Sequence, residues 1–252
     1  MNQPIGPLVG SGRVAEVFEY GDAVVKLYRQ PEARSDAFIE AATLAIVADH
    51  GLPTPRVFEA GRFKGRWGLV MERAEGEPLA RFTRGQPELV PDALEEMVSL
   101  HLRMHERPEL RLPPLKARLR RKLGQATQLP EDLREKLLTQ LAALPDGDRL
   151  CHGDFHPFNV VGLPGRAMVI DWLDASSGAP EADLCRSFVL MLPVVRELAE
   201  NYLDLYLARG SIARASVLAW LPVVAGARLA DHIPHEEELL LRLAAGGPHE
   251  EF

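Results

Sequence analysis

The spacing of apolar residues changes once along this chain, near residue 72, from the alternation typical of strands to the spacing typical of helices. This change constrains the fold more than any other feature of the sequence. Before it, alternating apolar and polar residues predict strands over residues 14–20, 23–28, 56–60 and 67–72, with a helix from about Ser35 to Ala48. After it, apolar residues recur at helical spacing over 92–105, 115–123, 133–144, 181–207, 211–228 and 236–243. The sequence therefore predicts an α+β protein, with a small antiparallel sheet and one helix followed by a mostly helical part.

The segment between these two regions is polar and flexible in composition. Its sequence is Arg73-Ala74-Glu75-Gly76-Glu77-Pro78, which shows neither the alternation of a strand nor the apolar spacing of a helix. We expect a lobe boundary here, which divides the chain into an N-terminal lobe over residues 1–72, a hinge over 73–78 and a C-terminal lobe over 79–252.

Charge and cysteine content exclude several classes of partner. A net charge of −7 over 252 residues argues against a nucleic-acid partner, because binding a polyanion needs a dense Lys/Arg face. The first residues lack the features of a signal peptide, and the longest apolar stretch is interrupted by Pro222 and Gly226, so we expect a cytoplasmic protein that does not contact membranes. Cys151 and Cys185 both follow a leucine and are predicted to be reduced, buried thiols.

Polar side chains are most concentrated between Cys151 and Asn159. His152, Asp154 and His156 alternate there as metal ligands on one face of an extended segment would, and Asp171 ends a short apolar strand over 167–170. Alternatively, Asp154, Asn159 and Asp171 could serve a nucleotide and its magnesium ion. These residues alone leave both interpretations open.

Three features of the first 72 residues bear on that choice. Gly10-Ser11-Gly12 precedes a hairpin and could bring backbone N–H groups close to a phosphate, although an ordinary turn would look the same. Lys26 interrupts an apolar strand, so it either extends to water or meets a carboxylate. Glu40 lies beside the small-residue face of the predicted helix, where it could point to Lys26 or to solvent.

The order of these motifs resembles the aminoglycoside phosphotransferase and choline kinase family. These are small-molecule kinases of a two-lobed, protein-kinase-like fold. The resemblance covers residues 10 to 172 and is strongest in the stretch Cys151-His-Gly-Asp-Phe-His-Pro-Phe-Asn159, which is close to the catalytic loop of the family. Departures are Arg13 after the second glycine and Ala15 where protein kinases carry a third glycine.

The resemblance implies a role for each candidate residue. Lys26 would hold the α- and β-phosphates of ATP (or GTP), with Glu40 orienting it, and Asp154 would accept or orient the proton of the acceptor hydroxyl. Asn159 and Asp171 would bind Mg²⁺. The remaining nucleotide contacts would come from the glycine loop and from the hinge backbone next to the adenine: Gly10, Ser11, Gly12, Glu72 and Ala74. Asp183, after Gly178 and Pro180, would brace the catalytic loop.

The function expected on this basis is transfer of the γ-phosphate of ATP to a hydroxyl group of a small molecule. Asp174 and Glu181 would suit a cationic acceptor such as an aminosugar or choline, whereas acidic residues further on, above all the cluster at Glu236, fit a solvated surface. The protein would be a monomer or a weak homodimer. Two alternatives are a nucleotide-binding protein without activity and a metal-dependent hydrolase that uses His152, Asp154, His156 and Asp171.

Overall fold

The computed structural model describes residues 3–249, which form two compact units. The first unit comprises Met1–Leu89 and Pro157–Leu173, and the second comprises Val90–His156 and Asp174–Phe252. The chain therefore enters each unit twice. The first unit is larger than the N-terminal lobe expected over residues 1–72, because it also includes residues 79–89 and 157–173. The expected lobe boundary at residues 73–78 stays a prediction.

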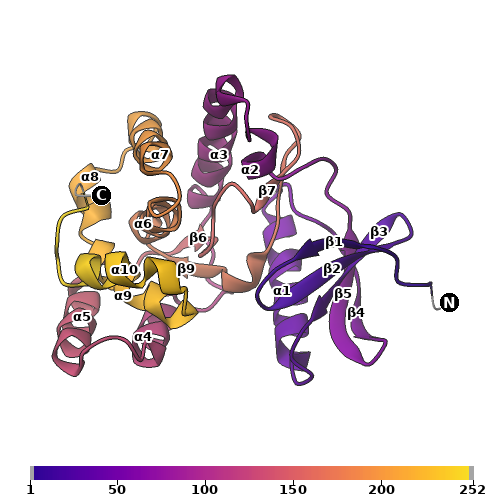
Figure 1. The fold of residues 1–252 in the computed structure, drawn as a ribbon, viewed down its shortest axis with the longest axis horizontal. Helices are drawn as coiled ribbons and strands as arrows, with labels where there is room; N and C mark the ends of the chain where they lie inside the picture. Colours follow the sequence, from indigo (N-terminus) through magenta and orange to yellow (C-terminus); the bar gives the residue numbers. More distant parts are fainter. Residues whose placement is uncertain (1–2, 250–252) are drawn as a thin grey trace. The chain divides into compact units, whose positions relative to one another are not determined.

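A five-stranded antiparallel sheet forms the centre of the first unit (Figure 1). Its strand order is β1-β2-β3-β5-β4, with β1 (Leu8–Ser11), β2 (Ala15–Tyr20), β3 (Ala23–Tyr28), β4 (Val57–Phe63) and β5 (Arg66–Glu72). Side chains alternate across β3. Val25 and Leu27 pack with Val70 in an apolar cluster on one face of the sheet. Lys26, between them, must therefore point to the opposite face.

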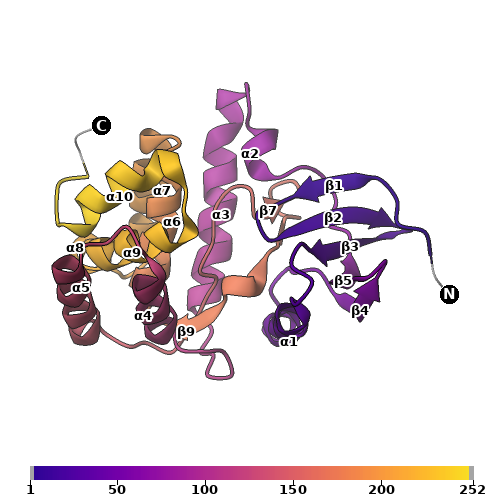
Figure 2. The same cartoon turned by 60° about the horizontal axis from the view of Figure 1, so that its bottom comes forward.

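Helix α1 (Arg34–Asp49) packs against β4 and β5 (Figures 1 and 2). Its buried side chains include Glu40. This helix and strands β2 to β5 lie within a few residues of the ranges predicted from periodicity, whereas β1 was not predicted. The fold class predicted from the sequence is therefore confirmed for this part.

The segment Pro157–Leu173, in which the chain returns to this unit, forms a short hairpin. Strands β7 (Val160–Val161) and β8 (Met168–Val169) pair antiparallel, with Val160 opposite Val169. The hairpin is tied to the rest of the unit by a hydrogen bond from the Val169 N–H to the Pro53 carbonyl and by bridge pairing of Val161 with Pro78. Helix α2 (Leu79–Phe82) follows that bridge.

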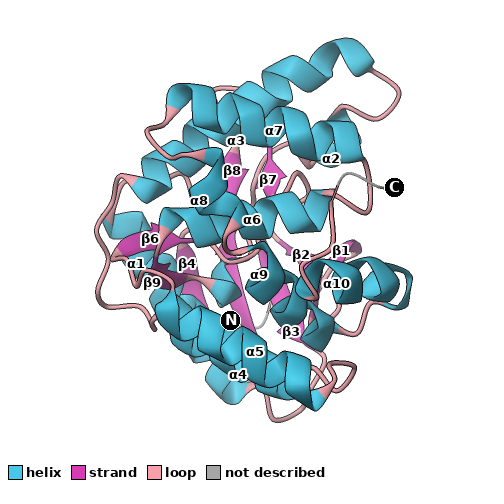
Figure 3. Ribbon diagram, turned by 90° about the vertical axis from the view of Figure 1, so that its left-hand side faces the viewer, coloured by secondary structure: helices cyan, strands magenta, loops and turns pink. Residues whose placement is uncertain are grey.

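The second unit is mostly helical (Figure 3). Almost every residue of α6 is buried, and this helix packs against α7, α8 and α9. Strands β6 (Arg149–Cys151) and β9 (Ser176–Gly178) form a small antiparallel pair. The helices are α3 (Val90–His105), α4 (Leu115–Gln125), α5 (Glu131–Ala143), α6 (Pro180–Met191), α7 (Arg196–Arg209), α8 (Arg214–Leu218), α9 (Leu221–Arg228) and α10 (Glu237–Ala244), with short 3₁₀ helices at Leu229–Asp231 and Pro234–Glu236. The 3₁₀ helix Pro87–Leu89 belongs to the first unit, and the one at Trp172–Asp174 lies where the chain passes from the first unit to the second.

Two helices predicted as continuous are interrupted. The helix expected over 181–207 is split into α6 and α7, and the one expected over 211–228 is split into α8 and α9. The breaks lie beside Pro193 and Pro222. Proline lacks the N–H that a helix interior needs and its ring collides with the preceding turn, so it is found instead in the first turn of α9.

Both cysteines are free and buried, as the sequence predicted. Burial raises the pKa of the Cys151 and Cys185 thiols, so neither is a reactive thiolate. Within the described residues 3–249, no helix has both the length and the apolar content needed to cross a membrane.

Candidate active site

Lys26 is the buried cation of the first unit. Its Nζ atom lies 2.7 Å from Glu40 Oε1 and 2.7 Å from Asp171 Oδ1, and the residue is 6% exposed. Burial alone would lower the pKa of this ammonium group, but the two carboxylates outweigh burial and raise it. Lys26 is therefore fully charged at neutral pH, and the structure brings together three residues that lie far apart in the sequence.

Glu40 is held by a second donor that the sequence did not reveal. The Tyr28 hydroxyl donates to Glu40 Oε2, and Glu40 itself is 1% exposed. Burial, followed by the charge of Glu40, raises the pKa of Tyr28, which keeps the phenol protonated as a donor. Tyr28 lies two residues after Lys26 on β3 and points to the same face of the sheet, and that period of two is the signal that could have identified it.

The β7–β8 hairpin explains why Asn159 and Asp171 can act together. Asn159 directly precedes β7, and Asp171 follows shortly after β8. The antiparallel register brings these two chain ends side by side, and the Ile170 N–H donates to the Asn159 carbonyl at 2.9 Å. Asn159 is 7% exposed, whereas the Asp171 side chain is 40% exposed. Two side chains with oxygen atoms therefore stand at one end of the hairpin.

Asp171 adopts a left-handed backbone conformation, with φ at 64°. Such a conformation is uncommon outside glycine, although Asp and Asn tolerate it better than other residues. Strained backbone of this kind is concentrated at functional sites, because the surrounding structure must hold it in place. Here it directs the carboxylate to Lys26.

In the predicted glycine loop Gly10-Ser11-Gly12, the first two residues end strand β1 and only Gly12 lies beyond it. The glycines are not needed for this backbone conformation. Neither has a positive φ, and a Cβ atom added at Gly12 would come no closer than 3.6 Å to the Ala15 carbonyl. Ser11 and Gly12 are exposed, and Arg29 braces them by donating to Ser11 Oγ at 2.8 Å and to the Gly12 carbonyl at 3.1 Å. Close approach of a ligand to the backbone remains a reason for glycine at these positions.

The residues predicted to face adenine lie at the end of β5. Glu72 receives hydrogen bonds from the Arg56 guanidinium, at 3.0 Å from Nε to Oε2, and this pairing lowers the pKa of the Glu72 carboxyl. The Glu72 side chain is therefore bound to Arg56, just before β4, so only main-chain groups at this position are left for a base. Ala74 is half-buried just beyond it.

Asp154 lies in the second unit and is surrounded by cationic and polar groups. Arg186 Nη2 lies 3.2 Å from Oδ1, and His156 Nε2 lies 3.4 Å from Oδ2. Burial alone would raise the pKa of Asp154, but the hydrogen bond from His156 and the charge of Arg186 outweigh burial and lower it. The carboxylate is therefore ionised at neutral pH, as a hydroxyl-orienting group must be. Arg186 was not predicted from the sequence.

The backbone before Asp154 is anchored by Asp183 near the start of α6. The His152 N–H donates to Asp183 Oδ2 and the Gly153 N–H to Oδ1, both at 2.7 Å. Asp183 is fully buried and also contacts Nε2 of His101 at 3.1 Å and of His105 at 3.3 Å. The bracing role expected for Asp183 agrees with this geometry.

The two α3 histidines, expected as packed residues, belong to this anchor. The Nδ1 atoms of His101 and His105 contact the hydroxyl groups of Tyr202 and Tyr206 at 2.5 and 2.6 Å. Burial lowers the pKa of His101 to about 4, so this ring is neutral at pH 7. Each ring thus has a polar partner on both nitrogens, which is the arrangement of a hydrogen-bond network rather than of an open metal site.

One of the ligands supposed for the alternative hydrolase already has a partner. His152 Nδ1 accepts a hydrogen bond from the backbone N–H of Asp154 at 3.2 Å. Among residues 3–249, His101, His105 and Asp183 do come close enough together to resemble a metal-binding group, but they form the anchor described above.

Comparison with solved structures shows the same fold in known phosphotransferases. The aminoglycoside phosphotransferase APH(4)-Ia, as a thermostable mutant in ternary complex with ADP and hygromycin B, has a TM-score of 0.64 at 17% identity, covering 96% of this chain and 92% of that one. APH(3'')-Id from Streptomyces rimosus has a TM-score of 0.63 at 21% identity, covering 90% and 93%. The type VIII aminoglycoside-3'-phosphotransferase has a TM-score of 0.61 at 20% identity, covering 92% and 93%.

Sequence comparison gives a family but no individual relative. No curated protein matches the chain in sequence. The family described as "Phosphotransferase enzyme family" matches residues 9–220, which include the glycine loop, the Lys26 and Asp154 regions and the β7–β8 hairpin. Because that match spans most of the chain, and because the fold agrees with it, this protein belongs to the phosphotransferase enzyme family.

Proposed function

We propose that the protein transfers the γ-phosphate of ATP to a hydroxyl group of a small molecule. The observation that carries the proposal is the buried Lys26, held at 2.7 Å from both Glu40 and Asp171. A lysine at this depth contributes little to folding, because the desolvation of three charges offsets most of their attraction. A role toward phosphate accounts for it, since Lys26 would be oriented by Glu40 and would bind phosphate oxygens as a point charge.

The residues at the end of the β7–β8 hairpin fit a magnesium ion. Mg²⁺ prefers oxygen ligands and few protein side chains, and Asn159 and Asp171 together offer an amide oxygen and a partly exposed carboxylate. When bound, the ion supplies charge neutralisation for the phosphate groups. The glycine loop would approach the phosphates through its backbone, and main-chain groups from Glu72 to Ala74 would face the adenine.

Asp154 would orient the acceptor hydroxyl. Its lowered pKa makes it a weak proton acceptor, which suits phosphoryl transfer, where the acceptor proton moves late and positioning supplies most of the rate. Arg186 contacts one oxygen of this carboxylate and His156 contacts the other. Asp183 fixes the backbone that carries it.

The test is the variant Asp154→Ala, with Asp148→Ala as the control. Asp154→Ala should lower kcat by roughly 10²–10⁴-fold, whereas the dissociation constant for MgATP should stay nearly unchanged, because Asp154 acts on the acceptor. Asp148 lies on the same segment with a half-exposed side chain, and its replacement should leave both values unchanged. Turnover measured by ADP release and affinity measured by calorimetry separate these effects.

Three results would contradict this proposal in distinguishable ways. Near-normal turnover of Asp154→Ala would remove Asp154 from the mechanism. MgATP binding without transfer to any alcohol would indicate a nucleotide-binding protein without activity. Stoichiometric zinc with no nucleotide affinity would favour the hydrolase. Replacing ATP by GTP in the same assay determines the nucleotide preference.

A further inference from the structure

Arg186 connects the carboxylate proposed to orient the acceptor hydroxyl to the interior of the second unit. It lies on α6, the helix that also carries Asp183, and it is 8% exposed. Its Nε atom donates to the Gly153 carbonyl at 3.2 Å, and its Nη2 atom donates to Asp154 Oδ1 at 3.2 Å. One guanidinium group therefore holds both the backbone before Asp154 and the Asp154 side chain.

The same guanidinium group also binds Asp231. This residue lies in the 3₁₀ helix Leu229–Asp231, which follows α9, and its Oδ2 atom accepts from Arg186 Nη2 at 3.1 Å. The Nη2 atom therefore donates to two carboxylates, those of Asp154 and Asp231. Because a guanidinium group is planar and its donors have fixed directions, a carboxylate bound to one donor determines where the others point.

Asp231 is itself held firmly. It is 5% exposed, and it lies 3.2 Å from Lys122 Nζ on α4 and 2.9 Å from Arg228 Nη1 on α9. Together with Arg186 on α6, these contacts join the 3₁₀ helix to three helices of the second unit. Asp231 is therefore a fixed point from which the Arg186 guanidinium can be oriented.

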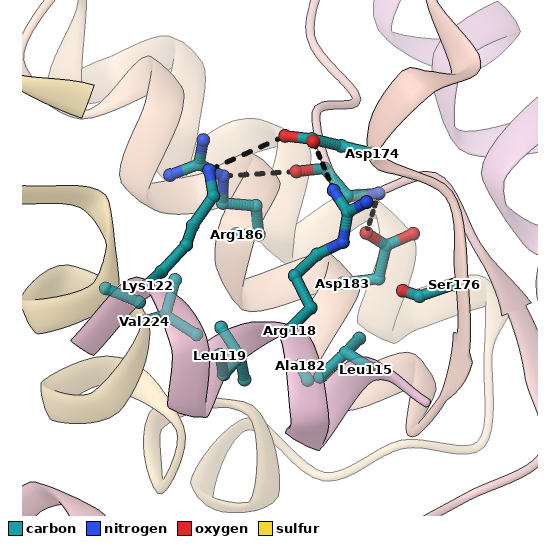
Figure 4. Close-up of a pocket in the computed structure, with 12 residues that line it drawn as sticks. Leu115, Arg118, Leu119, Lys122, Asp174, Ser176, Ala182, Asp183, Arg186 and Val224 are labelled. Atoms are coloured by element: carbon teal, nitrogen blue, oxygen red, sulfur yellow. Dashed lines mark hydrogen bonds and ion pairs between the residues drawn. The ribbon is translucent and has the colours of Figure 1, made fainter. Parts of the chain in front are cut away.

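The neighbouring cations have carboxylate partners of their own. Arg118 and Lys122 line a small pocket beside Gly153, and Figure 4 shows both side chains pointing to Asp174. Asp174 accepts from Arg118 and lies 3.5 Å from Lys122 Nζ, and these two cations lower its pKa although burial would raise it. Asp174, which the sequence suggested as a partner for a cationic acceptor, is therefore already paired. Charges around Arg186 are balanced within the protein.

This balance determines what Arg186 does to Asp154. While Asp231 is ionised, the charge of Arg186 is shared between two carboxylates. Without the charge of Asp231, Arg186 would be a buried cation with Asp154 as its remaining carboxylate, and buried opposite charges attract strongly. The Asp154 side chain would then turn toward Arg186 and leave the position that it has in the structure.

We infer that Asp231 is a positioning residue for phosphotransfer, which acts through Arg186 to keep the Asp154 carboxylate in place for the acceptor hydroxyl. This inference rests on the proposed function, in which Asp154 orients that hydroxyl. A displacement of about 1 Å in a positioning group can lower a rate by roughly 10²-fold. Asp231 should therefore affect turnover and leave the binding of MgATP unchanged.

The experiment compares Asp231→Asn with the matched control Glu236→Gln. Glu236 is also 5% exposed and also binds Arg228, at 2.8 Å from Nε, but the contacts that the structure describes for Arg186 do not include it. Asp231→Asn should lower kcat about 10- to 100-fold with an unchanged dissociation constant for MgATP. Glu236→Gln should change both values by less than about 2-fold, even if thermal melting shows that it destabilises the protein equally.

Turnover is measured as ADP release from MgATP. Water is the first acceptor, and hygromycin B, streptomycin, choline and glycerol are the test alcohols. If Asp231→Asn does not fold, Asp231→Glu takes its place. Glutamate keeps the charge but moves the carboxylate by one methylene group, so kcat should fall about 3- to 10-fold with MgATP affinity unchanged.

A double variant tests whether Asp231 acts through Arg186. Lysine keeps the charge of Arg186 but lacks the planar set of donors, so Arg186→Lys should lower kcat about as much as Asp231→Asn. If the two residues act in series, the double variant should lose less than about 2-fold more than either single variant. Losses that multiply would show that Asp231 affects turnover by a route other than Arg186.

Hydrogen exchange gives a measurement that needs no turnover. In Asp231→Asn, the amides of residues 150–158 should exchange about 3-fold or more faster than in the unchanged protein, because Arg186 no longer holds the Gly153 carbonyl in one place. In Glu236→Gln, the same amides should keep their exchange rates. Arg186→Lys should resemble Asp231→Asn.

Several outcomes would overturn the inference. Unchanged turnover and exchange in Asp231→Asn, an equal loss of kcat in Glu236→Gln, or a parallel loss of MgATP affinity would each do so. If no acceptor gives ADP release, the proposed function is contradicted, and the exchange rates alone then decide whether Asp231 holds the loop. Faster exchange in Asp231→Asn but not in Glu236→Gln would keep the positioning role, and equal rates would remove it.

Discussion

Each of the two units contains a buried ionic cluster, and the two clusters differ in how far their side chains are exposed to solvent. The Lys26 cluster (Lys26, Tyr28, Glu40 and Asp171) includes one carboxylate, Asp171, whose side chain is 40% exposed. The Asp183 cluster (Asp183, His101, His105, Tyr202 and Tyr206) is enclosed, and the Asp183 side chain is fully buried. A ligand could therefore replace a partner in the first cluster, whereas the second can only hold its own members.

This difference indicates what each cluster contributes. In the Lys26 cluster the exposed Asp171 can exchange Lys26 for a ligand group, and the left-handed backbone at Asp171 keeps it directed to the site. In the Asp183 cluster every contact ends on side chains or on the backbone of His152 and Gly153. The first cluster therefore suits binding, and the second suits the rigid positioning of Asp154.

The largest effect is expected from breaking the enclosed cluster. Asp183→Asn keeps the size of the side chain but removes its charge and one acceptor, so buried donors lose their partner. The free energy of unfolding should fall by about 3–5 kcal/mol, measured by urea denaturation. The control is Asp204→Asn, because Asp204 is largely exposed, and a change within about 0.5 kcal/mol is expected there. A loss for Asp183→Asn as small as that of the control would show that the cluster does not anchor the loop.

A smaller effect on the free energy of unfolding is expected from a change of pH, and it arises from His101 in the Asp183 cluster. Burial lowers the pKa of His101 from 6.5 to about 4, so between these values the unfolded chain binds a proton that the folded chain does not. The free energy of unfolding should therefore rise with pH across this window and fall by up to about 3 kcal/mol as pH drops from 6.5 to 4.

The His101 contribution can be isolated by substitution. His101→Gln should flatten the pH dependence of the free energy of unfolding in this window, because the titrating ring is gone. His156→Gln, at a partly exposed histidine outside the cluster, should leave it in place. An unchanged slope in His101→Gln would assign the pH dependence to other groups.

The smallest effect on stability is expected from the exposed member of the Lys26 cluster. Asn tolerates the left-handed backbone of Asp171, and the buried pair of Lys26 with Glu40 remains, so Asp171→Asn should cost less than about 1 kcal/mol of unfolding free energy. Its effect should instead be on binding. Nucleotide affinity should fall about 10-fold with magnesium and change little without it, in parallel titrations.

Equal nucleotide affinities of Asp171→Asn and the unchanged protein in the presence of magnesium would remove Asp171 from the metal site. A large loss of stability would remove the contrast between the two clusters, because Asp171 would then be as structural as Asp183. Thermal melting and calorimetry on the same preparation distinguish these two results.

Local patterns in the sequence predicted the elements of the first unit well. Alternation identified the strands on both sides of Gly21, and helical spacing together with Gly51 identified α1. These signals work because each reflects backbone geometry within a few residues. Long-range packing left weaker traces, and strands of two or three residues such as β6, β7 and β9 are too short for any period to be detected.

Site residues that belong to a sequence motif could be predicted, whereas site residues brought in by tertiary packing could not. Lys26, Glu40 and Asp171 were named from their order along the chain, and the structure brings the three together. Arg186 was missed because an arginine in a regular helix has no distinctive spacing. Tyr28 was missed although its spacing of two residues from Lys26 on the same strand was an available signal. The pairing of Asp174 could not be predicted either, because its sequence neighbours do not reveal the cations of α4 that pair with it.

The first unit is built from two separate segments of the chain, and this limits how the protein can be divided or recombined. A fragment ending at Leu89 would hold Lys26 and Glu40 but would lack Asn159 and Asp171, which return with Pro157–Leu173. A single crossover between two related genes, placed between these segments, would likewise separate Lys26 from Asn159 and Asp171. Exchanging a nucleotide-binding half between relatives, or building a split reporter from this chain, therefore requires two junctions, one of them within the few residues between Asp154 and Asn159.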